Sequence, residues 1–142
     1  MYNATKEFRF EMAHVLTNYN GLCGNLHGHS YKCLVTISSD SLDDGMVMDF
    51  STIKKIINEK VLGPMDHACA FNSNSDDEFE NELYLLCRKH GKRMIVFPFR
   101  TTAENMSKWI YDRINDEIGN LLIQCTKVEL YETTTGHATY EE

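Results

Sequence analysis

Two segments in which apolar and polar residues alternate are the feature that most constrains the fold of this chain. In the first, Phe8, Phe10 and Met12 occupy one side, and His14 continues that side. In the second, over residues 27–38, the apolar positions are again two residues apart, namely Tyr31, Cys33, Val35 and Ile37. Because successive side chains of a strand point to opposite faces, each segment predicts a strand with one buried face. The Asn- and Gly-containing stretch between them predicts a hairpin with a long connection.

The rest of the chain predicts three helices and two further strands. They are a helix from about Asp49 to Gly63-Pro64, a helix over 78–90, a strand over 93–98, a helix from the capping box at 101–104 to Gly119, and a strand over 128–132. In the helix over 78–90, the apolar stripe expected to face the core consists of Phe79, Leu83, Leu86 and Cys87.

This order of elements predicts an α+β fold, in which helices pack on one face of an antiparallel sheet. At 142 residues the chain has about the size of one domain, so we expect a single domain over residues 1–142. Such a sheet has two edges to protect, and oligomerisation is an economical way to cover them.

Charge and composition argue against several classes of protein. The formal net charge of −7 disfavours nucleic-acid binding, which depends on Lys and Arg neutralising phosphates. The acidic run at 76–82 is interpreted as solvated surface. The first twenty residues lack an apolar signal segment, and the apolar run at 94–99 is far too short for a membrane span, so we expect a cytoplasmic protein. The five cysteines are an odd number without a Cys-x-x-Cys pair, which favours reduced thiols.

Two histidines at the start of the second strand predict a metal site. His27 and His29 are two residues apart, so their side chains project to one face and can converge on one ion. The hairpin brings His14, at the end of the first strand, against the same face. The alternative is that each is a core histidine with satisfied hydrogen bonds. Three histidines on neighbouring strands favour zinc with an open fourth position, which is typical of catalytic sites.

Cys23 lies four residues before His27, and this spacing leaves its role open. In a structural centre, the thiol closes the metal site as a fourth ligand. In a catalytic centre, it stands just outside the ligands, where the nearby cation favours the thiolate as a base or nucleophile.

Two acidic positions stand out for chemical reasons. Asp66 directly precedes His67 in a predicted loop, and a carboxylate beside an imidazole can orient a proton-transfer histidine; the alternative is an ordinary surface pair. Glu132 follows Val128 and Leu130 on an apolar strand face, where an unpaired carboxylate is costly. It is therefore expected to meet a cation or a donor-rich ligand, unless the strand frays there and water solvates the carboxylate.

Six segments, in the same order along nearly the whole chain, resemble the 6-pyruvoyltetrahydropterin synthase and 6-carboxytetrahydropterin synthase family. They are FEMAH, CGNLHGHSY, GMVMDFSTIKK, MDHACAFN, TTAENMSKWIYD and VELYETTTG. A single His-Gly-His would be weak evidence, whereas six segments in register are specific. The resemblance implies the tunnelling fold, in which trimers pair into hexamers, a barrel forms by oligomerisation and the active sites lie at subunit interfaces.

The resemblance also implies a role for each candidate residue. The zinc ligands that it implies are His14, His27 and His29. It makes Cys23 the catalytic thiol, and Asp66 with His67 the proton-transfer pair. Glu132 would bind the guanidine-like edge of a pterin, because paired N–H donors suit a carboxylate, and Thr102 would contact the pterin at the start of a helix.

The spacing Cys-x-x-x-His-Gly-His is similar to the bacterial 6-carboxytetrahydropterin branch, which serves queuosine and other deazapurine pathways. The similarity implies conversion of 7,8-dihydroneopterin triphosphate to 6-carboxy-5,6,7,8-tetrahydropterin, with release of acetaldehyde and triphosphate. The alternatives are a 6-pyruvoyltetrahydropterin synthase, a side-chain aldolase of the same fold, and a non-catalytic pterin- or zinc-binding module. The chain departs from the family pattern at Thr101, where proline is frequent, and in a longer segment at about 76–93.

Overall fold

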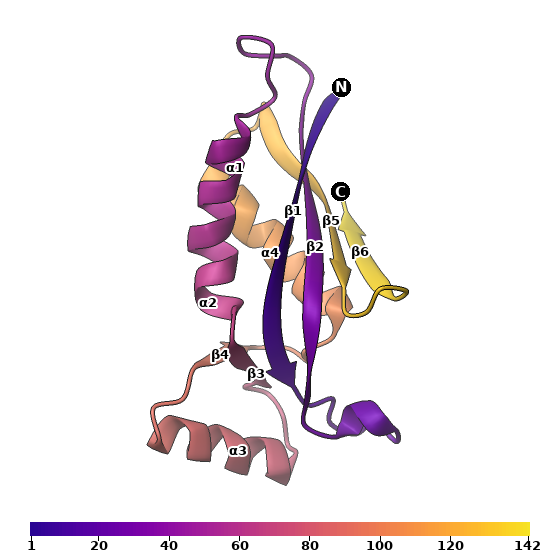
Figure 1. Cartoon of the computed structure of the whole chain (residues 1–142), viewed down its shortest axis with the longest axis vertical. Helices are drawn as coiled ribbons and strands as arrows, with labels where there is room; N and C mark the ends of the chain where they lie inside the picture. Colours follow the sequence, from indigo (N-terminus) through magenta and orange to yellow (C-terminus); the bar gives the residue numbers. More distant parts are fainter.

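The computed structural model describes all 142 residues of the chain (Figure 1). Its strands are β1 (Tyr2–His14), β2 (His27–Ser39), β3 (Ala68–Asn72), β4 (Met94–Phe97), β5 (Ile123–Tyr131) and β6 (His137–Glu141). Its helices are the single turn η1 (Leu22–Gly24), α1 (Phe50–Ile57), η2 (Asn58–Leu62), α2 (Gly63–Met65), α3 (Glu78–Lys89) and α4 (Ala103–Ile118). None of these helices combines the length and the hydropathy that a transmembrane span requires.

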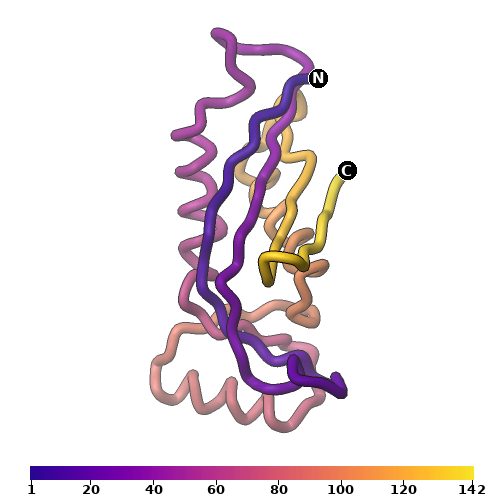
Figure 2. The backbone as a smooth tube through the Cα atoms, turned by 45° about the vertical axis from the view of Figure 1, so that its right-hand side comes forward, coloured from indigo at the N-terminus to yellow at the C-terminus, as the bar shows by residue number.

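The six strands form one sheet in the order β4-β3-β1-β2-β5-β6. β1 and β2 pair along their whole length as the predicted hairpin, from Tyr2 opposite Ser39 to His14 opposite His27. The sheet curls into a half-barrel, with α1 and α4 on one side of the hairpin (Figures 1 and 2). The predicted α+β architecture is therefore confirmed, and β4 and β6 are left as the two edges of the sheet.

The sheet is mixed, which corrects the expectation of purely antiparallel pairing. β1, β2, β5 and β6 pair antiparallel, whereas β3 runs parallel to β1 and β4 runs parallel to β3. The sequence prediction did not include β3 and β6. Each has only five residues, and β3 pairs with β1 at just two positions, Met12 with Ala68 and Ala13 with Cys69. Strands this short leave little periodicity to detect.

The helix predicted after Asp49 is confirmed at its start and continues beyond its predicted end. The Asp49 carboxylate accepts the Ser51 N–H at 2.6 Å and so caps α1. The helix passes through the wide turn η2, where the Gly63 N–H bonds to the Asn58 carbonyl five residues earlier, and ends only at Met65. Pro64 has no N–H to donate to the preceding turn, and a π-type turn accommodates that missing bond.

The core lies between the sheet and the helices α1 and α4. The capping box at 101–104 located the start of α4 to within one residue, but the N-cap is Thr102 and not Thr101: the Thr102 side chain accepts the Asn105 N–H at 3.3 Å. Gly119 ends this helix with a φ of 56°, in the left-handed region that glycine adopts at low cost. The inward stripe of α4, Met106, Ile110 and Ile114, is fully buried together with Tyr31, Val35 and Ile37 of β2.

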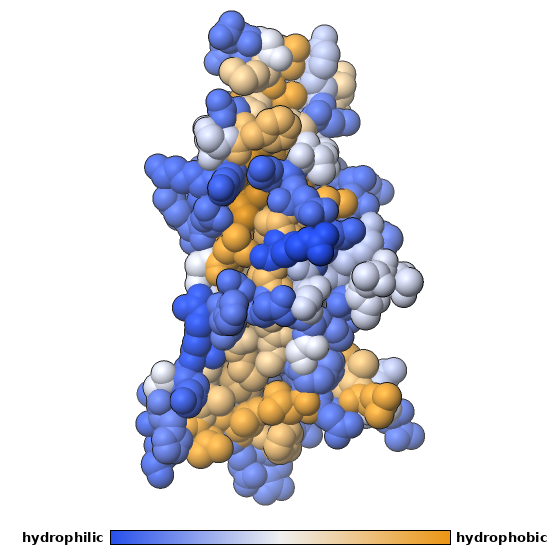
Figure 3. Space-filling view, viewed as in Figure 1, coloured by the Kyte–Doolittle hydropathy of each residue, from blue (hydrophilic) through white to orange (hydrophobic).

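Helix α3 lies apart from this core, at the lower end of the molecule (Figure 1). Its predicted inward stripe was wrong at Phe79 and Leu86, which are 51% and 54% exposed. The other two members, Leu83 and Cys87, are partly buried, and Glu80, which the stripe did not include, is only 3% exposed. The Glu80 carboxylate accepts the Asn72 N–H at 2.7 Å and the Tyr84 ring packs edge-on against Phe71, so a polar and an aromatic contact attach α3 to β3. Apolar side chains consequently gather on the surface at this end (Figure 3).

Candidate active site and metal centre

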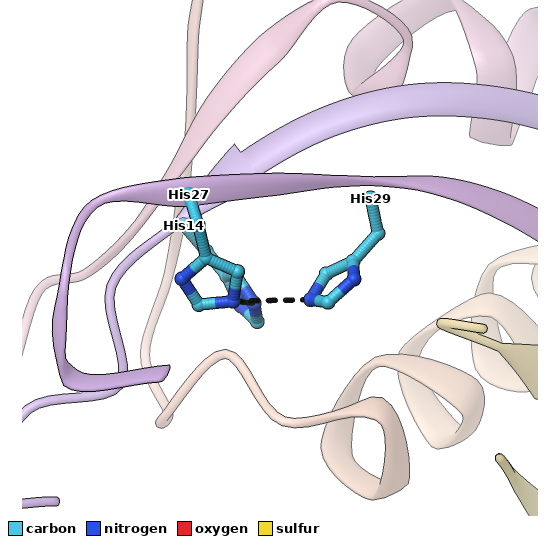
Figure 4. Close-up of side chains that lie close together, drawn as sticks. All are labelled: His14, His27 and His29. Atoms are coloured by element: carbon cyan, nitrogen blue, oxygen red, sulfur yellow. Dashed lines mark hydrogen bonds between the residues drawn. The ribbon is translucent and has the colours of Figure 1, made fainter. Parts of the chain in front are cut away.

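Three histidine side chains converge at the end of the β1–β2 hairpin where the connection between the two strands begins (Figure 4). His14 ends β1 directly opposite His27, and His29 is two residues further along β2 on the same face. The Nε2 atom of His27 lies 3.1 Å from the Nε2 atoms of both His14 and His29. Tetrahedral zinc with Zn–N bonds of about 2.0–2.1 Å needs nitrogens roughly 3.3 Å apart, so the three imidazoles fit one metal ion.

Backbone carbonyls decide which nitrogen of these rings faces the centre. The Nδ1–H of His14 donates to the Thr101 carbonyl at 2.8 Å, and the Nδ1–H of His27 donates to the Asn25 carbonyl at 2.7 Å. In neutral rings these bonds leave both Nε2 atoms as acceptors. Two lone pairs then face each other at 3.1 Å, an arrangement that a bound cation stabilises.

Burial favours the neutral form of two of these imidazoles, His14 and His29, and metal binding requires that form. His14 is fully buried, and burial lowers its pKa to about 4, an effect that the neighbouring histidines strengthen and the bond to Thr101 opposes. Burial also lowers the pKa of His29, as does the neighbouring His27. Neutral rings offer their lone pairs to a metal without first losing a proton.

A pocket of about 360 Å³ lies beside the histidines and contains three of the predicted site residues. Cys23, Thr102 and Glu132 line it together, although they lie far apart in the sequence. Glu132 connects the pocket to the metal centre, because its carboxylate lies 3.9 Å from the Nε2 atom of His29. Burial raises the pKa of Glu132, and the nearby Glu104 raises it further. This carboxylate is held in a partly desolvated position, as expected of a group that meets donors on a ligand.

Cys23 lies outside the group of candidate metal ligands, which consists of the three histidines alone. It sits in the turn η1, is half-buried, and its carbonyl accepts the Leu16 N–H at 3.1 Å. Cys23 therefore lines the pocket from a folded loop and is not part of the histidine group.

Asp66 and His67 form a close pair in a different place. The Asp66 carboxylate lies 2.9 Å from Nδ1 of His67 and accepts the Glu11 N–H at 2.9 Å. The His67 N–H donates to the Glu11 carbonyl at 2.6 Å, and His67 adopts a φ of 64°. Both residues are thus fixed to the β1 backbone just before β3. His67 is 73% exposed and lines a separate shallow pocket of about 340 Å³ with Glu11 and Ser30.

The sequence prediction missed three groups that shape this site. Thr101 and Asn25 act through backbone carbonyls, which every residue type carries, so no sequence signal marks them. In the sequence, Thr101 differed from the family pattern only in replacing a frequent proline, and this difference leaves the backbone carbonyl in place. Glu104 lines the pocket with Glu132. The only sequence signal for it was its position two residues after Thr102, which was already expected to contact the ligand at the start of a helix.

The comparisons with known proteins agree with this geometry. A sequence model described as 6-pyruvoyl tetrahydropterin synthase matches residues 3–142. The chain belongs to this family. A 6-carboxy-5,6,7,8-tetrahydropterin synthase from Haemophilus influenzae is 39% identical, with 100% of both chains covered. The enzyme of the same name from Aquifex aeolicus is 34% identical, covering 99% of this chain and 98% of its own.

Solved structures show the same fold. A Wolinella succinogenes protein matches with a TM-score of 0.75 at 21% identity, covering 99% of this chain and 98% of its own. The 6-pyruvoyl tetrahydropterin synthase of Plasmodium falciparum matches with a TM-score of 0.72, also at 21% identity and with the same coverage. At this identity the likeness concerns the fold alone, and it confirms the tunnelling fold that the sequence motifs predicted.

Proposed function

We propose that the protein converts 7,8-dihydroneopterin triphosphate to 6-carboxy-5,6,7,8-tetrahydropterin, with release of acetaldehyde and triphosphate, in queuosine or related 7-deazapurine biosynthesis. The observation that carries the proposal is the pocket in which Cys23, Thr102 and Glu132 meet beside three converging histidines. The names of the full-length relatives from Haemophilus influenzae and Aquifex aeolicus support the product.

In this proposal, some residues bind the pterin and others carry out the chemistry. Glu132 accepts the paired N–H donors of the pterin, and Thr102, at the N-cap of α4, contacts the same ring system. Cys23 moves a proton to and from the substrate side chain as a general acid-base group. Zinc held by His14, His27 and His29 would supply Lewis-acid polarisation of the substrate's side-chain hydroxyls.

The Asp66–His67 pair acts, in this proposal, from a neighbouring copy of the chain. Within one chain it lies outside the pocket that Cys23 lines, so a site that uses both groups is incomplete without a second copy. The free edges β4 and β6 provide strands for such pairing. We therefore propose trimers that pair into a homohexamer, with each site formed between subunits. A cytoplasmic location and the absence of nucleic-acid partners remain predictions.

Product analysis tests the proposed function. Zinc-loaded protein is incubated with 7,8-dihydroneopterin triphosphate, and the pterin product is identified by chromatography and mass spectrometry. We expect 6-carboxy-5,6,7,8-tetrahydropterin. Formation of 6-pyruvoyltetrahydropterin or 6-hydroxymethyl-dihydropterin would replace this reaction by another of the same fold. Unchanged substrate that nevertheless binds would favour a non-catalytic pterin-binding module.

A further inference from the structure

Three consecutive residues before α4 contact three different parts of the proposed site. Thr101 holds the metal-site histidine His14 through its carbonyl, and Thr102 lines the pocket. Arg100 reaches in another direction, where its Nη2 atom donates to the Thr17 carbonyl at 2.7 Å. Thr17 belongs to the connection between β1 and β2, residues 15–26, which carries Cys23 and is called the cysteine loop below.

The cysteine loop is well ordered internally. The Leu16 N–H bonds to the Cys23 carbonyl, which closes the loop across its base. Turn bonds join Gly24 to Gly21 and Asn25 to Leu22 through their backbone groups. A Cβ atom at Gly24 would lie 2.6 Å from the Tyr19 carbonyl oxygen, so the loop folds tightly on itself. It therefore moves as a unit if it moves at all.

Few hydrogen bonds attach the cysteine loop to the rest of the fold. The pocket of about 360 Å³ lies on one side, and a groove of about 670 Å³ separates the loop from Asp77 and Phe79 at the start of α3 on the other. Figures 1 and 2 both show this loop projecting at the end of the molecule where α3 lies. Apart from the adjoining His27, Arg100 is the one residue outside the loop whose side chain hydrogen-bonds to it.

Hydrogen bonds also fix the backbone of Arg100. The Arg100 carbonyl accepts the Thr102 N–H at 2.8 Å and the Asn105 side-chain amide at 3.0 Å, which hold it at the start of α4. A charged guanidinium bound to a carbonyl makes a stronger hydrogen bond than a neutral pair. The link joins residues 83 positions apart and spans from the helix that lines the pocket to the loop that supplies the thiol.

We propose that Arg100 is a positioning residue, which ties the cysteine loop to the start of α4 and so holds Cys23 at the pocket. The catalytic consequence rests on the proposed function, in which Cys23 transfers protons and a displacement of about 1 Å is costly. The tether itself does not rest on that function, because it is a property of the resting protein.

The test compares Arg100→Gln, Arg100→Lys and Arg88→Gln in the full-length, zinc-loaded protein. Arg88 is an exposed arginine of α3 without a hydrogen bond to the loop, so its variant controls for the loss of one positive charge. Amide hydrogen exchange is measured by mass spectrometry for peptides that cover residues 15–26. Steady-state kinetics on 7,8-dihydroneopterin triphosphate separate kcat from KM.

Arg100→Gln should speed exchange in residues 15–26 by roughly tenfold or more, with little change elsewhere. Its kcat should fall about tenfold while KM stays within about twofold, because the pterin contacts remain. Arg100→Lys, which keeps a charged donor, should recover part of both effects. Wild-type exchange in Arg100→Gln would overturn the proposal, as would loop exchange that rises equally in Arg88→Gln. If the wild type fails to turn the substrate over, the proposed function fails, while the exchange comparison still decides the tether.

Discussion

At the scale of single residues, two backbone carbonyls orient two of the three histidines that could hold a metal ion. The alternation of side chains along a strand predicted that His14, His27 and His29 share a face, and the structure confirms it. This alternation could not predict the orientation of the rings, because the Thr101 carbonyl that accepts the His14 Nδ1–H lies 87 residues away in the sequence. Residue types and spacing thus determine which side chains meet, whereas packing over long sequence separations determines how they are presented.

His27→Ala should abolish metal binding. It removes the ring whose Nε2 atom lies 3.1 Å from both other imidazoles, so zinc affinity should fall by more than about 100-fold, since even outer partners of metal ligands contribute 10–100-fold. Zinc content after dialysis, measured by atomic emission, checks this. The matched control is His90→Ala, an exposed histidine at the end of α3. Stoichiometric zinc in His27→Ala would remove His27 from the site.

Glu132→Ala should weaken pterin binding rather than metal binding. Loss of a charged acceptor for paired donors costs roughly 1.5–3 kcal/mol, which is about 10–150-fold in Kd. Fluorescence titration of the zinc-loaded protein with a dihydropterin measures the change. Glu129→Ala is the control, because Glu129 lies in β5 three residues before Glu132, which follows the end of that strand, and pairs with Lys127. Equal affinities in the two variants would mean that water solvates Glu132 and no ligand contacts it.

At the scale of elements, the sequence pattern predicted the long helices and strands, whereas pairing with a neighbouring strand determines the short strands. The β1–β2 hairpin and α4 were predictable because alternation or helical spacing extends over many residues. β3 and β6 exist because a neighbouring strand offers its edge, which no local pattern records. α3 formed where it was predicted but with a different buried face, since the Glu80 carboxylate bonds to the Asn72 N–H and the Tyr84 ring packs against Phe71 of β3.

Glu80→Ala should loosen α3 without unfolding the domain. The substitution leaves the Asn72 N–H without its acceptor, at a cost of about 1–3 kcal/mol. Because α3 contributes no residue to the main core, this cost should appear as local opening. Amide exchange in residues 78–89 should rise by roughly 5–150-fold while that of β1 and β2 stays unchanged. Glu82→Ala, an exposed acid of the same helix, is the control; similar exchange in both variants would contradict the role of Glu80.

At the scale of the whole molecule, the burial of His14 makes the stability of the fold depend on pH. His14 is buried at the end of the longest hairpin, and its pKa of about 4 lies below the ordinary value of 6.5. Between these pH values the unfolded chain binds more protons than the folded one. The contribution of His14 to stability is therefore fully present above pH 6.5 and is lost as the pH falls toward 4.

The free energy of unfolding of metal-free protein should consequently drop by about 3 kcal/mol over this range through His14 alone. Urea unfolding of the wild type, His14→Gln and His90→Gln at several pH values between 7 and 4 measures it. The wild type and His90→Gln should lose stability in parallel, and His14→Gln should lose less. A pH dependence that is identical in all three proteins would show that His14 is not held neutral by burial.

The proposed reaction is tested most directly by acetaldehyde. Zinc-loaded wild type supplied with 7,8-dihydroneopterin triphosphate should release one acetaldehyde for each triphosphate. Cys23→Ala, which keeps the three histidines and Glu132, should still bind zinc and pterin but release acetaldehyde roughly 10²–10⁴-fold more slowly, the range that a positioned acid-base group supplies. Triphosphate released without acetaldehyde would contradict the proposed reaction, and Cys23→Ala protein that had lost its zinc would make the thiol a ligand of a structural metal centre.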